Sequence, residues 1–140
     1  MYPILLLANL LVSAFLTGLI WFVQVVHYPI FSRVSPENFI RFHETHTALT
    51  GRLVVLPMLL ELALGLVLAL SHPHWTTWLA LALVVVAWLS TFFLSVPLHG
   101  QLHGGFDAEA ITRLVQTNWI RCLAWTARAL LLLWLVYRLL

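Results

Sequence analysis

Four long apolar blocks constrain the fold of this 140-residue chain more than any other feature of its sequence. They cover residues 4–26, 53–70, 75–96 and 119–140, each close to the roughly 20 residues that a helix needs to cross a bilayer. Lipid offers the backbone no hydrogen-bond partners, so each block must satisfy its own polar groups as a helix. Since 62% of the residues are hydrophobic and only 9% are charged, an ordinary soluble domain is excluded. The blocks predict a single all-α integral membrane domain, residues 1–140.

Helix-start and helix-stop signals divide the chain further. The segment His27-Tyr28-Pro29 follows the first block, and its proline predicts that the first helix ends near there. Ser35 is followed by a proline, which is typical of a capped helix start, so a second helix is expected over residues 36–70. Asp107 has the character of an N-cap for a last helix over residues 108–138. These signals predict a four-helix up-down-up-down bundle in which the second and fourth helices are longer than the membrane is thick.

The charge pattern predicts the orientation of the bundle. The net charge of +2 comes from seven arginines and no lysine, and their scatter excludes the basic patch of a nucleic-acid-binding protein. Arg33, Arg41 and Arg113 fall in the two connections on one side, whereas Arg138 lies near the other side. The positive-inside rule then places the first side in the cytoplasm and both termini outside. The second and fourth helices therefore extend beyond the bilayer on the cytoplasmic side.

Polar residues form one stripe on each predicted helix. Residues three or four positions apart share a helical face. Polar side chains are costly in contact with lipid, so these stripes are expected to face one another or a wet cavity. In chain order the stripes are Asn9, Ser13, Thr17, Gln24 and His27; His43, His46, Thr50, Pro57, Glu61 and Gly65; Thr91, Ser95, His99 and His103; and Asn118, Arg121, Trp125 and Arg128.

Glu61 and Arg128 are the most deeply placed charges. They lie about equally far along two parallel helices, which predicts an ion pair. Two interpretations stay open: a structural pair that fixes helix register, or a proton route or electrostatic partner for an anionic ligand. With Arg121, these two residues are the candidate catalytic groups.

Four histidines are candidate metal ligands. His27, His43, His46 and His99 come from three helices and belong to one end of the bundle. Imidazole binds iron, copper and zinc, and the spacing of His43 and His46 is that of two-ligand motifs in helical metal sites. A metal or haem site, a polar ligand pocket without metal, and a packing network are the three alternatives.

The depth of the ligands separates two kinds of metal centre. Haem b needs axial ligands at matching depth, and His27 and His99 lie near the ends of two parallel helices. A non-haem iron or copper site would use His43 and His46 as well. Asn118 and Trp125 are further candidate cofactor contacts, since Trp125 could stack on a quinone or a porphyrin.

Five segments occur in the order VQVVHYPIF, HETHT, LPMLLE, VPLHGQL and TNWIRCLAWTAR. In this order they resemble an uncharacterised family of small bacterial four-helix membrane proteins, and the resemblance covers nearly the whole chain. It implies a multi-pass protein of the bacterial inner membrane and brings no activity with it.

A more distant resemblance concerns the overall layout, which is similar to the HemJ-type protoporphyrinogen oxidases and the related CopD-like membrane domains. It implies haem b and electron transfer with a porphyrinogen substrate. That family places its histidine well inside the first helix, where this chain has none around Phe15, so its ligand is not carried over. The shared features are an aromatic-Pro-Phe element and a Pro-Met…Gly pattern: Tyr28, Pro29, Phe31, Pro57, Met58 and Gly65.

Two classes of function fit these residues. The first is a haem- or metal-binding redox enzyme or redox subunit that acts on a hydrophobic substrate or a quinone. The second is a non-enzymatic module that binds or transports a lipid, a quinone or protons and is centred on Glu61 and Arg128. Transport would require a homo-oligomer, since four helices enclose only a narrow pore. An accessory subunit is a variant of the second class.

Overall fold

The computed structural model describes residues 2–140, and it forms helices without strands over that range. Four continuous helical rods are long and apolar enough to cross a membrane: Tyr2–Phe31, Pro36–Ser71, Trp75–Leu102 and Ala108–Tyr137. This confirms the predicted all-α class and its four spans. The elements are α1 (Tyr2–Phe22), η1 (Val23–His27, a π-helical turn), α2 (Tyr28–Phe31), α3 (Pro36–Ser71), α4 (Trp75–Ser90), η2 (Thr91–Ser95, a second π-helical turn), α5 (Val96–Leu102) and α6 (Ala108–Tyr137).

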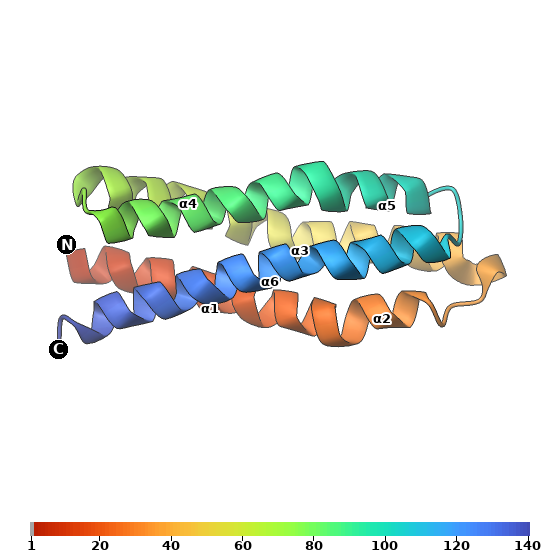
Figure 1. Ribbon diagram of the computed structural model, residues 1–140, viewed down its shortest axis with the longest axis horizontal. Coiled ribbons are helices and arrows are strands. Elements are labelled where there is room, and N and C mark those ends of the chain that lie inside the picture. The colour runs from red at the N-terminus through yellow and green to blue at the C-terminus, as the bar shows by residue number, and fades with distance from the viewer. Residues whose placement is uncertain (1) are drawn as a thin grey trace.

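The rods lie side by side along the long axis of the molecule (Figure 1). Both chain ends lie at one end, together with the turn between α3 and α4. The connections from α2 to α3 and from α5 to α6 lie at the opposite end. Helix α6 packs against α1 and α4, and α3 packs against the same two helices.

The outer surface of the bundle is apolar. Leu11, Phe93 and Leu123 are 71%, 72% and 62% exposed, and many other large apolar side chains share this position. Apolar surface on this scale exceeds what soluble monomers expose. The surface fits contact with the hydrocarbon of a bilayer.

The first helix ends at Phe31, two residues beyond Pro29, because a π-helical turn carries the helix past the proline. Proline lacks an N–H, and its ring clashes with the carbonyl four residues earlier. In η1 the chain widens, and the Tyr28 N–H donates to the Val23 carbonyl five residues back. The same adjustment precedes Pro97, in η2. Each extra residue in a turn shifts the face on which the following side chains lie.

The two predicted helix starts are formed in different ways. The Asp107 carboxylate accepts the backbone N–H groups of Glu109 and Ala110 at 2.9 and 3.0 Å, as the N-cap prediction requires. Ser35 directly precedes α3, but its side chain caps no backbone N–H. Its hydroxyl oxygen instead accepts from the Asn38 amide at 3.0 Å.

Candidate functional site

The four candidate histidines meet at the end of the bundle opposite the chain termini, as predicted. His27 lies in η1 and His99 in α5, while α3 contributes His43 and His46. His27 Nε2 lies 2.6 Å from His46 Nδ1, and His43 Nε2 lies 2.9 Å from His99 Nδ1. Each α3 histidine therefore pairs with a histidine of another rod.

Tyr28 and Arg121 extend the second of these pairs. Arg121 Nη2 donates to the Tyr28 hydroxyl oxygen at 3.1 Å, and this oxygen lies 3.3 Å from His99 Nε2. Because the Tyr28 oxygen accepts from the Arg121 guanidinium, we assign the Tyr28 O–H as the donor to His99 Nε2. His99 Nδ1 then carries a hydrogen and donates to His43. The sequence singled out Tyr28 only as part of a motif, and its hydrogen bonds were missed.

A buried phenylalanine holds the histidine rings in place. Phe31, at the end of α2, is fully buried. Its ring centroid lies 6.0, 5.0 and 6.4 Å from those of His43, His46 and His99. All three pairs are edge-on, which is one of the arrangements that aromatic rings prefer. Phe31 can reach this position because the helix continues beyond Pro29.

The ring nitrogens of these histidines face one another directly. Two ligands of a tetrahedral metal ion, bound at 2.0–2.1 Å, stand about 3.3 Å apart, whereas these pairs lie at hydrogen-bond distance. Within residues 2–140, no group of three or more His, Cys, Asp or Glu side chains is arranged to hold a metal ion. His27 and His99, the expected axial pair for haem, each contact an α3 histidine and make no ring contact with each other. The metal and haem assignments stay predictions.

A cavity of about 620 Å³ adjoins the cluster, between α3 on one side and α4, η2 and α5 on the other, and Tyr28 of α2 and Arg121 of α6 also line it. Its volume falls in the range of small-molecule sites. Gly51 and Gly100 belong to its wall, and a Cβ added at either would meet no atom within 4 Å. Most of the wall is apolar, and its charged or imidazole side chains are His46, His99, His103 and Arg121.

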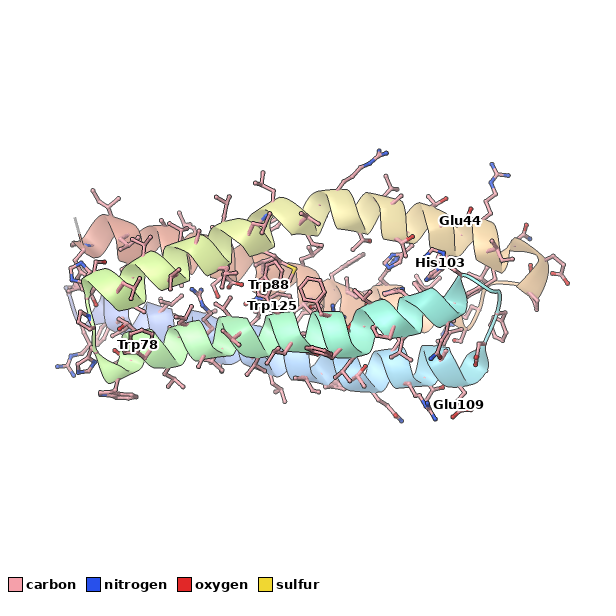
Figure 2. All side chains as sticks on the ribbon, turned by 90° about the horizontal axis from the view of Figure 1, so that it is seen from above. Glu44, Trp78, Trp88, His103, Glu109 and Trp125 are labelled. Carbon is pink, nitrogen blue, oxygen red and sulfur yellow. The ribbon has the colours of Figure 1, made fainter. Side chains whose placement is uncertain are left out.

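Figure 2 labels two residues of the cavity wall, Trp88 and His103. Trp88, which lines the cavity, lies near the middle of the bundle, and His103 lies toward the end that carries Glu44 and Glu109. The His103 ring stands edge-on to that of His43 at 4.8 Å. The cavity therefore extends from the middle of the bundle to the histidine cluster.

Arg121 is a buried cation that has no carboxylate partner among residues 2–140. Its exposure is 7%. Among residues 2–140 two ion pairs lie within 4 Å, Arg113–Glu109 and Arg128–Glu61. Arg121 donates to the Tyr28 hydroxyl, and its Nε is buried with no hydrogen-bond partner in that range. An unpaired buried charge is costly, so this wall of the cavity is electropositive.

The predicted ion pair of Glu61 and Arg128 is confirmed. Both side chains are fully buried, with Arg128 Nη1 3.2 Å from Glu61 Oε1, although the two atoms are not aligned as a hydrogen bond. Arg128 also donates to Asn9 Oδ1 at 2.8 Å and to the Ala80 carbonyl at 3.1 Å. Trp125 Nε1 donates to Glu61 Oε2 at 2.8 Å. The network joins all four rods.

The remaining predicted site residues lie apart from the cavity. Trp125 belongs to the Glu61 network, and Asn118 donates to Gln24 Oε1 at 2.7 Å within the core. Neither residue is part of the cavity wall. Arg121 lies with Tyr28 and the histidines, whereas Glu61 and Arg128 form the separate pair. The proposed catalytic trio is thus divided between two places.

Comparison with models of known families, with curated proteins and with solved structures gives no match for this chain. The family resemblances drawn from the sequence therefore stay predictions.

Proposed function

We propose that the protein is a membrane-embedded binding protein for a lipid-soluble molecule, held in the cavity with its polar head toward His46, His99 and Arg121. The observation that carries the proposal is an apolar cavity of about 620 Å³ whose polar wall includes a buried, unpaired arginine. Val55 and Phe92 line the cavity and are also 55% and 54% exposed on the outer surface. This supports access from the surrounding lipid.

Filling the cavity tests the proposal. Gly51→Leu and Gly100→Leu place a large side chain into open space on its wall, so they are expected to abolish binding without straining the helices. Gly18→Leu is the matched control, because Gly18 also has open space around it but lies on α1, outside the cavity wall. Native mass spectrometry of protein extracted from its membranes measures the bound molecule. Equal occupancy in all three variants and the wild type would refute the proposal.

A redox function with bound metal is a second candidate, favoured by four imidazoles from three rods in two direct pairs. A ring displacement of about half an ångström would bring each pair to the ~3.3 Å spacing of metal ligands. His27, His43, His46 and His99 would hold iron or copper, or two of them haem b. Such a centre would supply electron transfer to a quinone or another hydrophobic substrate beside it.

Metal analysis and an absorption spectrum of the purified protein test this second candidate. His99→Ala and His46→Ala should lower the bound metal or the haem absorbance. His74→Ala is the control, because His74 lies at the other end of the bundle as the N-cap of α4. A folded, colourless and metal-free protein would contradict the assignment.

We further propose an up-down-up-down placement in a bacterial inner membrane, with both termini outside and the first turns of α3 and α6 in the cytoplasm. The arginine distribution supports it. Cysteine labelling is a direct test, since the native Cys122 is buried. A membrane-impermeant thiol reagent added to intact cells should label Ser71→Cys and spare Ser35→Cys; the reverse pattern would invert the topology.

A further inference from the structure

We infer that the molecule bound in the cavity is a lipophile with a carboxylate head, of the long-chain fatty acid class, and that its carboxylate pairs with Arg121. This inference rests on the proposed function and specifies its ligand. It follows from the balance of buried charges, the free donors of Arg121, and the apolar character of the rest of the cavity wall.

The buried charges do not balance within the chain. The protein has five acidic residues, and only Glu61 is buried. Its carboxylate already pairs with Arg128. The other four acids are exposed on helix starts, turns and outer faces: Glu37, Glu44, Asp107 and Glu109. The interior therefore holds two guanidinium groups and one carboxylate, and the unmatched cation is Arg121 on the cavity wall. A neutral ligand would leave that cation uncompensated.

The donors around Arg121 suit a carboxylate. The guanidinium group offers five N–H donors in a planar fork that matches the two carboxylate oxygens. One nitrogen, Nη2, already donates to Tyr28. His46 lies on the same cavity wall. Its Nδ1 accepts hydrogen bonds from His27 and Thr50, and its Nε2 has no hydrogen-bond partner among residues 2–140. Arg121 and His46 can thus both donate to one anionic head.

The rest of the cavity wall suits a lipophile with an apolar tail. Val54, Met58 and Phe92 supply apolar wall for a hydrocarbon tail.

Matched ligands test the head group. Palmitic acid, methyl palmitate and a decyl-substituted benzoquinone are titrated into the purified protein in detergent, and binding is followed by calorimetry. Hydrogen bonds to charged groups contribute enough for the acid to bind at least about tenfold more tightly than its ester. Arg121→Gln should remove this preference, and Arg121→Lys should restore part of it. Arg138→Gln, at the far end of the bundle, should leave it unchanged.

The outcomes separate this inference from the proposed function. If the ester or the quinone binds the wild type as tightly as the acid, and Gly51→Leu abolishes that binding, the cavity is a lipid site but the carboxylate assignment is wrong. If no probe binds, both are wrong. An acid preference that is unchanged in both Arg121→Gln and Arg121→Lys also overturns the inference. If Arg121→Gln folds poorly, an unchanged acid preference in Arg121→Lys alone overturns it.

Discussion

Removing the charge of Glu61 should destabilise the bundle more than any comparable change at its surface. The variant Glu61→Gln keeps the shape of the side chain and an oxygen that can accept from Trp125 Nε1. It leaves Arg128, which is fully buried, without a counter-charge. Breaking one side of a buried pair costs about 3–5 kcal/mol. Arg128 retains two neutral acceptors, Asn9 Oδ1 and the Ala80 carbonyl, so about 3 kcal/mol is expected.

A double-mutant cycle separates the ion pair from its surroundings. Arg128→Met removes the cation that Glu61→Gln leaves unpaired, so the double variant should cost less than the sum of the single ones. A coupling of about 2 kcal/mol lies within the range found for residues in one network. The control is Glu109→Gln, whose partner Arg113 is exposed along with it; a surface pair on one helix is worth about 0.3–0.5 kcal/mol.

The free energy of unfolding, measured by reversible denaturation in mixed micelles, tests both the cost of Glu61→Gln and its coupling to Arg128→Met. The reasoning fails if Glu61→Gln costs no more than Glu109→Gln, or if the single effects add without coupling. Either result would mean that water or lipid reaches Arg128 and that the network does not hold the four rods together. Ligand binding in the cavity should persist in the folded Glu61→Gln variant, because Glu61 is not part of the cavity wall.

Two further predictions concern the helix starts and the histidine rings. Asp107→Ala removes an N-cap with two backbone hydrogen bonds and should cost about 1 kcal/mol of unfolding free energy, whereas Ser35→Ala, which removes no such bond, should cost clearly less; equal losses would contradict the capping assignment. Phe31→Ala empties a fully buried site and should cost about 3–5 kcal/mol and weaken ligand binding, whereas Phe93→Ala on the outer surface should affect binding little. A Phe31→Ala variant with wild-type stability and affinity would show that this ring does not position the histidines.

Regular helices and the cost of polar groups in lipid explain what could be predicted from the sequence. Equal distance along two parallel helices was sufficient to place Glu61 opposite Arg128, because α3 and α6 each run as one continuous helix. The same reasoning brought four histidines to one end of the bundle. These predictions needed only the phase of each helix and the direction in which it runs.

The proline segments were not predictable in this way. A π-helical turn inserts one residue per turn, so the phase of the helix changes across η1 and η2. The positions of Tyr28 and Phe31 depend on that change. A sequence pattern with a constant period of 3.6 residues predicts only that the helix ends near Pro29. The resulting hydrogen bonds of Tyr28 were therefore missed.

The cavity was missed because it depends on volumes between rods and not on periodicity. Gly51 and Gly100 lie on different rods, and nothing in the sequence indicates that the space beside both is open. The isolation of Arg121 did have a signal in the sequence. With one acidic residue inside a predicted span and with Arg121 and Arg128 both well inside the last one, a buried cation without a partner could have been inferred by counting.

The most direct test of the central claim is to locate the bound lipophile. A palmitic acid analogue with a photoactivatable diazirine near its carboxylate is equilibrated with the protein in nanodiscs, irradiated, and mapped by peptide mass spectrometry. Because the diazirine lies near the carboxylate, crosslinks should concentrate around His46 in α3, His99 in α5 and Arg121 in α6, and Gly51→Leu should remove them. Crosslinks spread over the lipid-facing sides of all four rods, unchanged by Gly51→Leu, would contradict the account.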